Sequence, residues 1–273
     1  MLVVDGLTKT FGDARAVDGL GFTLRAGEVL GLVGPNGAGK TTTLRCLSGI
    51  LRPDAGRIVI GGADMARDPV AAKARAAYVP DEPELFEYLT VDEHLALLGR
   101  LYSVPDPEPR AARLLERFAL IEKKGAYPDE LSRGMRRKLA TACALLPGPD
   151  VLILDEPFTA LDPPAIRDLR ALVLEQAAAG RAVILSSHLL ALLERLAHRF
   201  LLLDQGRLVA HGTLAELAVQ LGQEGDLDEL FERALASSTV DPAGDVPSVD
   251  PEPAPEAPPP AESAPEAPAE PIE

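Results

Sequence analysis

The sequence predicts an α/β fold built on a mainly parallel β-sheet. Short apolar runs of strand length recur along the chain, and segments with helical spacing of apolar residues lie between them. This alternation is typical of a parallel sheet that is covered by helices on both faces. The chain has 273 residues, which is long enough to bury a substantial hydrophobic core.

The first part of the chain predicts strands. Apolar runs occupy residues 2–4 and, after a Phe-Gly turn, residues 16–24. The run EVLGLV at 28–33 is apolar along most of its length and ends at Gly34, which suits a buried strand. A helix is expected next, at residues 41–50.

A strand at 57–60 is expected because turn residues flank it on both sides. Between about 85 and 146 the pattern becomes helical, which predicts a helical insertion into the sheet. Apolar residues at helical spacing predict one helix at 91–101 and a second at 110–120. A proline cluster at 105–109 is expected to separate these two helices.

The second half of the chain returns to alternating elements. The runs VLIL at 151–154 and AVILS at 182–186 predict buried strands, with a helix at 164–179 between them. Two further strands, at 199–203 and 207–209, flank the turn sequence DQG and predict a hairpin.

Prolines and acidic residues are concentrated at the C-terminal end of the chain. The formal net charge is −15, but residues 241–273 contain 11 prolines, nine acidic residues and no Lys or Arg, which leaves −6 for residues 1–240. Such a segment repels itself and has little to bury. We expect a folded domain at 1–235 and a disordered tail with polyproline II character at 236–273. A docking site for a proline-recognising partner is the alternative role for the tail.

Composition excludes several classes of protein. The two cysteines, Cys46 and Cys143, cannot form a disulfide framework, which favours a reducing cytoplasm. No window approaches the roughly 18 apolar residues that span a bilayer, and the N-terminus lacks a signal-peptide layout. An acidic chain also lacks the clustered Lys and Arg that bind nucleic acid, so we expect no nucleic-acid partner.

A glycine-rich loop predicts a nucleotide site. The sequence GPNGAGKT at 34–41 fits the phosphate-binding pattern G-x-x-x-x-G-K-[ST], between a predicted strand and a predicted helix. Its backbone N–H groups can surround phosphate oxygens, Lys40 can reach the β- and γ-phosphates, and the Thr41 hydroxyl suits Mg²⁺. The expected nucleotide ligands here are Gly34, Pro35, Asn36, Gly37, Ala38, Gly39, Lys40, Thr41 and Thr42.

Two carboxylates follow the apolar strand at 151–154. Ligands of open α/β sheets bind beyond the carboxyl ends of the strands, so Asp155 is expected to hold the metal of a bound ATP·Mg²⁺. Glu156 comes next, and a second acid beside the metal site is suited to act as a general base for water. Unpaired buried charge is costly, which argues against two acids that merely end a strand.

These motifs resemble the nucleotide-binding subunit of ATP-binding cassette (ABC) transporters over residues 1–235. LSRGM at 131–135 resembles the family signature LSGGQ, in which Ser132 and Gly134 would face the γ-phosphate from a helix N-terminus. The resemblance implies a P-loop NTPase fold with an N-terminal antiparallel β-subdomain and a helical subdomain. It also implies nucleotide contacts from Leu131, Ser132, Arg133, Gly134 and Met135.

Further parts of the sequence carry the same resemblance. The segment TALD at 159–162 resembles the D-loop, which in the family crosses a dimer interface and here ends at Asp162. His188 resembles the switch histidine that contacts the γ-phosphate, a role that suits an imidazole as a hydrogen-bond donor. Phe11 would stack on adenine with Val17 beside it. Packing of Phe11 into the core is the alternative.

The sequence departs from the family pattern in places. Asp81 stands where the family has the Q-loop glutamine; its carboxylate can still bind Mg²⁺, although it adds negative charge beside the phosphates. Arg133 and Met135 replace a glycine and the final glutamine of the signature. These variants and the segment 84–91 resemble subunits that pair with membrane proteins of the ABC-2 type, many of which are exporters.

The resemblance implies an ATPase made of two cassettes. Lys40, Glu156 and His188 would act on an ATP that the signature of a second copy closes, and a homodimer is expected. Without a membrane span, the chain is expected to work at the inner face of the cell membrane through a separate multi-span permease. A soluble ABC-type ATPase would need a long coiled coil or two cassettes in one chain, and a non-hydrolysing ATP-binding regulator would not need Glu156.

Overall fold

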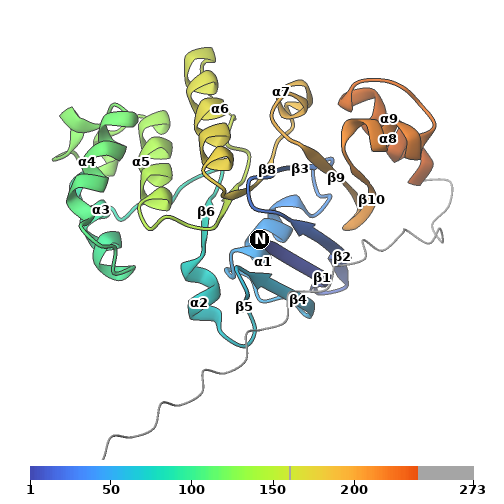
Figure 1. Cartoon of the computed structure of the whole chain (residues 1–273), viewed down its shortest axis with the longest axis horizontal. Helices are drawn as coiled ribbons and strands as arrows, with labels where there is room; N and C mark the ends of the chain where they lie inside the picture. The colour runs from blue at the N-terminus through green and yellow to red at the C-terminus, as the bar shows by residue number, and fades with distance from the viewer. Residues whose placement is uncertain (160, 239–273) are drawn as a thin grey trace, which may run out of the picture.

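Figure 1 shows the computed structural model, which describes residues 1–159 and 161–238. A four-stranded antiparallel sheet forms the N-terminal subdomain in the order β2-β1-β4-β5. Its strands are β1 (Leu2–Phe11), β2 (Ala14–Leu24), β4 (Ala55–Ile60) and β5 (Ala63–Asp64). The expected antiparallel subdomain is therefore confirmed, with a first strand that runs well beyond residues 2–4.

A six-stranded sheet lies at the centre, in the order β10-β9-β3-β8-β7-β6. All of its neighbouring strands are parallel except the hairpin of β9 and β10. Its strands are β3 (Val29–Val33), β6 (Ala76–Val79), β7 (Val151–Leu154), β8 (Ala182–Ser186), β9 (Arg199–Asp204) and β10 (Arg207–Gly212). The mainly parallel sheet and the hairpin around DQG are both confirmed.

Burial explains why these strands are apolar. Every residue of β3, β7 and β8 is buried, because helices or the second sheet cover both faces. One core lies between the two sheets and includes helix α1 (Lys40–Leu47). A second core lies on the opposite face, under α6 (Pro163–Ala178) and the C-terminal helices.

Helices flank the central sheet at both ends (Figure 1). The C-terminal helices α8 (Leu214–Leu221) and α9 (Leu227–Ser238) pack on each other, and both contact β10. Two short helices complete this body: α2 (Pro69–Ala74) before β6, and α7 (Leu190–Glu194) after β8. None of these four helices is predicted individually; α2, α7 and α8 have eight residues or fewer, and such short helices give little periodic signal.

The helical insertion forms a separate layer, coloured green in Figure 1. It consists of α3 (Val91–Leu101), α4 (Pro107–Arg117), the short 3₁₀ turns Ile121–Lys123 and Pro128–Glu130, and α5 (Arg133–Leu145). These elements share a core of their own. The expected helical subdomain is confirmed, although prolines 107 and 109 begin α4 rather than precede it, because proline fits the first turn of a helix.

The end of the domain differs slightly from the expected boundary. Helix α9 continues to Ser238, three residues beyond the expected domain end at 235. The remainder of the predicted tail, residues 239–273, lies outside the described residues. Among the residues that the structure describes, no helix has the length and apolar character needed to cross a membrane.

Candidate functional site

The phosphate loop connects β3 to α1 at the carboxyl edge of the central sheet. Gly39 is the N-cap of α1 with a φ of 98°, and a Cβ placed on it would lie 2.2 Å from the carbonyl oxygen of Ala16. A Cβ on Gly34 would lie 2.6 Å from the carbonyl oxygen of Leu203. Glycine is therefore required at both positions, by backbone conformation at Gly39 and by close packing at both.

Lys40 is buried inside this loop. Its Nζ donates to the carbonyl oxygens of Gly34, at 2.6 Å, and Pro35, at 3.2 Å. Burial lowers the pKa of Lys40, and the nearby charges of Glu156 and Asp155 oppose that shift. The Lys40 ammonium therefore lies close to both carboxylates that were predicted to act with it.

Asp155 is buried at the end of β7 and is held by three hydroxyl groups. Thr41 Oγ1 and Ser186 Oγ donate to its Oδ1 at 3.2 and 2.8 Å, and the Tyr78 hydroxyl donates to its Oδ2 at 3.1 Å. Burial and the charge of Asp155 raise the pKa of Tyr78 to about 12, so the phenol remains a neutral donor. The structure thus brings the predicted pair Thr41 and Asp155 together.

Glu156 and His188 form a second pair beside Asp155. His188 Nδ1 lies 2.8 Å from Glu156 Oε2, and the backbone N–H of His188 donates to the same oxygen at 3.2 Å. The backbone N–H of Glu156 donates to Ser186 Oγ at 2.8 Å. The Glu156 backbone has a φ of 46°, a left-handed conformation that needs such support from its surroundings.

The residues in this cluster fit ATP and Mg²⁺. Mg²⁺ prefers oxygen ligands and is commonly held by one or two protein oxygens together with phosphates and water. Thr41 Oγ1 and the Asp155 carboxylate supply such oxygens side by side. A Cβ on Gly37 would meet no atom within 4 Å, so the tip of the loop leaves open space where phosphates could approach the backbone.

The two residues expected at the adenine ring differ in accessibility. Phe11 is 50 % exposed at the end of β1, with Lys9 Nζ 5.5 Å from its ring centroid. This excludes the alternative that Phe11 packs into the core. Val17 is only 1 % exposed and belongs to the core between the two sheets. Strand β2 turns the Val17 side chain inward, and the place of Val17 beside the adenine ring stays a prediction.

The signature segment lies apart from the phosphate loop. Ser132 is the N-cap of α5, and its Oγ accepts from the backbone N–H of Met135 at 3.2 Å. Leu131 is buried in the core of the helical subdomain, and its contribution to a nucleotide site stays a prediction. In the described part of the chain, no hydrogen bond joins residues 131–135 to residues 34–42. Asp162 likewise serves as a helix cap, and accepts from Ala165 N–H at 2.8 Å.

Asp81 has a different partner from the one expected. Its Oδ1 lies 2.6 Å from Nη2 of Arg137 and 4.0 Å from Nη2 of Arg133, both on α5. No hydrogen bond among the described residues joins Asp81 to Thr41 or Asp155. Metal ligation by Asp81 stays a prediction, and in this structure its carboxylate is paired with a buried guanidinium.

Comparison with known proteins decides the family. Residues 17–159, just over half of the chain, match the sequence profile of the family described as ABC transporter. The chain belongs to this ABC transporter family. It is similar to the ABC-type transporter ATP-binding protein EcsA of Bacillus subtilis, with 37% identity over 234 residues, 85% of this chain and 95% of the relative. The family resemblance of the sequence is therefore confirmed, and the chain is an ATP-binding subunit of an ABC transporter.

Other relatives of this ABC subunit are named for export. A Nod factor export ATP-binding protein of Paraburkholderia xenovorans is 42% identical over 230 residues, which are 83% of this chain and 75% of the relative. A solved structure of an ATP-binding subunit of an ABC transporter has a TM-score of 0.82 and 36% identity, and the match covers 86% of this chain and 99% of that one. These matches confirm the predicted fold and nucleotide-binding class.

Three residues around the site of this ABC subunit are not predicted by the sequence. Tyr78 and Ser186 hold Asp155, and Arg137 holds Asp81. Ser186 and Tyr78 lie on β8 and β6, the strands on either side of β7. The polar residue that ends the apolar run AVILS was a usable signal for Ser186. No local pattern marked Tyr78 or Arg137.

Proposed function

We propose that the chain hydrolyses ATP and thereby drives export of a substrate through a separate membrane subunit. The observation that supports this best is the convergence of Lys40, Thr41, Asp155 and Glu156 at one edge of the sheet. Family membership implies ATP hydrolysis, and relatives named for export or drug resistance favour export over import as the direction of transport. The substrate itself would be selected by the membrane subunit.

The residues divide the chemistry between them. Thr41 and Asp155 would hold Mg²⁺, which supplies positive charge to the phosphates of bound ATP. Glu156 Oε2 is occupied by His188, while among the described residues no hydrogen bond is made to Oε1. Oε1 is therefore the atom to accept a proton from the attacking water. Lys40 and His188 would stabilise the charge that develops on the γ-phosphate.

A second copy of the chain would complete each site. Ser132 and its neighbours begin helix α5 in the helical subdomain, and among the described residues they make no hydrogen bond to the phosphate loop of their own chain. The N-terminus of a 13-residue helix attracts anions through its free N–H groups and its dipole. We infer that this helix end meets the ATP held by the partner copy, so that two cassettes enclose two nucleotides head to tail.

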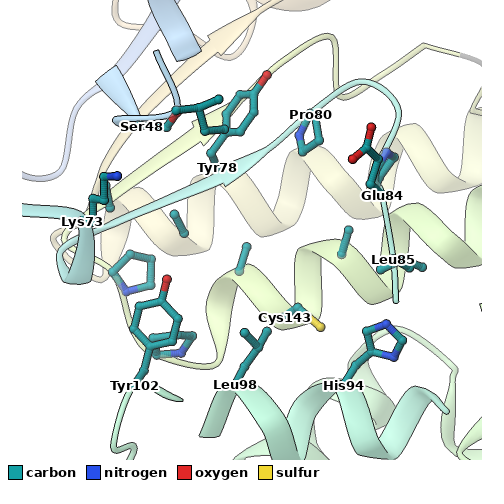
Figure 2. Close-up of a pocket in the computed structure, with 18 of the residues that line it drawn as sticks. Ser48, Lys73, Tyr78, Pro80, Glu84, Leu85, His94, Leu98, Tyr102 and Cys143 are labelled. Carbon is teal, nitrogen blue, oxygen red and sulfur yellow. The ribbon is translucent and has the colours of Figure 1, made fainter. Parts of the chain in front are cut away.

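A groove between the central sheet and the helical subdomain would receive the membrane subunit. It has a volume of about 550 Å³, and Figure 2 shows side chains from both bodies pointing into it. Its lining includes Ile50, Leu85, Phe86, Leu98 and Tyr102. Phe86 is 60 % exposed, and exposed apolar surface of this kind is typical of protein interaction sites.

Tyr78 links this groove to the nucleotide site. Its ring lines the groove (Figure 2), and its hydroxyl donates to Asp155 Oδ2 at 3.1 Å. A partner that moves the wall of the groove would therefore act on a residue that holds the metal-binding carboxylate. This contact offers a direct route by which docking and ATP turnover influence each other.

Replacing Phe86 by Glu is expected to weaken binding of the membrane subunit at least tenfold, because a charge in the apolar groove must be desolvated without a partner. The measurement is copurification of the membrane protein with the tagged full-length chain. ATP hydrolysis by the isolated variant should stay within about twofold of wild type. Val219→Glu is the control, because Val219 is also exposed, at 83 %, but lies on α8 away from the groove. Equal copurification by both variants would contradict this docking surface.

Replacing Phe11 by Ala is expected to raise the Kd for ATP about 10-fold, since stacking of a base on an aromatic ring contributes about 1–3 kcal/mol. The exposed ring lies at the end of the β1–β2 hairpin, and β2 also carries Ala16, whose carbonyl oxygen packs against Gly39 of the phosphate loop. Isothermal titration with ATP and with triphosphate lacking a base measures the effect. Phe11→Tyr should bind ATP like wild type; an unchanged Kd for Phe11→Ala would refute the stacking role.

A further inference from the structure

One buried side chain contacts three separate segments around the site. Arg137 lies in α5 and is only 6 % exposed. Its Nη1 donates to the carbonyl oxygens of Pro157, at 3.1 Å, and Thr159, at 2.7 Å. Its Nη2 donates to the backbone carbonyl and to Oδ1 of Asp81, the latter at 2.6 Å. Helix α5, the segment after β6 and the loop after β7 therefore meet at one guanidinium.

The geometry requires an arginine at this position. A guanidinium is planar and directs several N–H donors along fixed directions, whereas a lysine ammonium is a single point charge. Two nitrogens of Arg137 serve partners on two different loops. The buried charge needs a counter-ion, and the Asp81 carboxylate provides it. A neutral glutamine at position 81, as in the family pattern, would leave the guanidinium uncompensated.

The loop held by Arg137 is the one that carries Glu156. Pro157 follows Glu156 directly, and the N–H of Thr159 donates to the Glu156 carbonyl at 3.2 Å. Glu156 keeps a strained left-handed φ of 46°, supported on its N–H side by Ser186. Arg137 supports the other side of the same loop through two carbonyl oxygens. Loss of these two hydrogen bonds would allow the backbone at Glu156 to move, and the Glu156 carboxylate would move with it.

We propose that Arg137, paired with Asp81, is a positioning residue for ATP hydrolysis. It ties the orientation of the helical subdomain to the loop that carries Glu156, so that the carboxylate is aligned only when α5 stands in this arrangement. The Arg137 side chain touches no reacting atom; it acts through the carbonyls of Pro157 and Thr159. The inference rests on the proposed function, because it concerns the water-activating role of Glu156.

Arg137→Gln in the full-length chain is expected to lower kcat for ATP by about 10- to 100-fold, because small displacements of a catalytic group have effects of that size. KM for ATP should change less than about twofold, because the hydrogen bonds of the Arg137 side chain within the described part of the chain go to Pro157, Thr159 and Asp81 and to neither the phosphate loop nor Phe11. Arg136→Gln is the matched control. Arg136 is the adjacent residue on the same helix, and its side chain makes one long hydrogen bond, to Pro128 at 3.5 Å.

The double variant Asp81→Asn with Arg137→Gln separates positioning from folding. It removes both charges together, so it should recover most of the Tm lost in Arg137→Gln, while kcat stays low because the two carbonyl contacts remain missing. A kcat for Arg137→Gln within twofold of wild type would overturn the inference. So would a double variant that recovers kcat along with Tm, because the pair would then only stabilise the fold.

Failure of this inference differs from failure of the proposed function. If Glu156→Gln hydrolyses ATP like wild type, Glu156 is not the base and the proposed mechanism fails. If Glu156→Gln is inactive while Arg137→Gln matches wild type, only the positioning role of Arg137 fails. Measuring both variants in the same phosphate-release assay distinguishes the two outcomes.

Discussion

Replacing Glu156 by Gln is expected to lower the rate of ATP hydrolysis by about 10²- to 10⁴-fold, the usual contribution of a general base. Glutamine has nearly the same shape as glutamate, and its oxygen can still accept hydrogen bonds from the His188 backbone and ring, as Glu156 Oε2 does. It cannot accept a proton from water. The substitution should therefore slow the chemical step of ATP hydrolysis and leave the geometry of the site intact.

ATP binding should persist in the Glu156→Gln variant, because Lys40 and the glycine loop are unchanged. Since the γ-phosphate is not removed, two chains should remain associated around ATP. Phosphate release measures the rate, and gel filtration with and without ATP measures the dimer. Glu175→Gln is the control, because Glu175 lies near the C-terminal end of α6 and forms a surface ion pair with Arg117 of α4. Hydrolysis near the wild-type rate would refute the base assignment.

Replacing Gly39 by Ala is expected to destabilise the protein by about 3 kcal/mol and to abolish tight ATP binding. The residue has a φ of 98°, and the added Cβ would lie 2.2 Å from the Ala16 carbonyl oxygen. Strained backbone costs about 1–3 kcal/mol, and overpacking adds a similar amount. Backbone carbonyls cannot swing aside as a flexible side chain does, so the loop and strand β2 must separate.

Gly37→Ala is the matched control for this effect. Gly37 has a similar left-handed φ of 83°, but a Cβ there would meet nothing within 4 Å. Its substitution should cost only the backbone strain, about 1–2 kcal/mol. Urea unfolding of the nucleotide-free chains compares the two. Equal losses of stability would show that contact with Ala16 contributes nothing, and that the φ angle alone requires glycine at position 39.

Local patterns predicted much of the central fold. The fully buried strands β3, β7 and β8 were recognised because each is a short unbroken apolar run. Strand β6 was missed, because its sequence AAYV is only partly buried and has two alanines in place of large apolar residues, unlike the equally short β7. Helix α3 was located correctly from its apolar periodicity, and the structure adds a Thr90–Glu93 capping box at its start. The burial of the Val17 and Leu131 side chains was not predicted, because strand register and subdomain packing turn both into cores.

Local sequence patterns were enough to predict which residues form the nucleotide site. The phosphate loop is one continuous segment, and Asp155 and Glu156 directly follow an apolar strand. Because ligands of open α/β sheets bind beyond the carboxyl ends of the strands, the loop and the two carboxylates are expected at the same edge of the sheet. The side chains that hold Asp155 and Asp81 in place follow from the packing of distant segments. Tyr78 is 77 residues from Asp155, and Asp81 is 56 residues from Arg137. The strand order β8-β7-β6 and the packing of α5 create these contacts. A local sequence pattern contains no record of which distant segments will lie side by side, and that is why these partners became visible only in three dimensions.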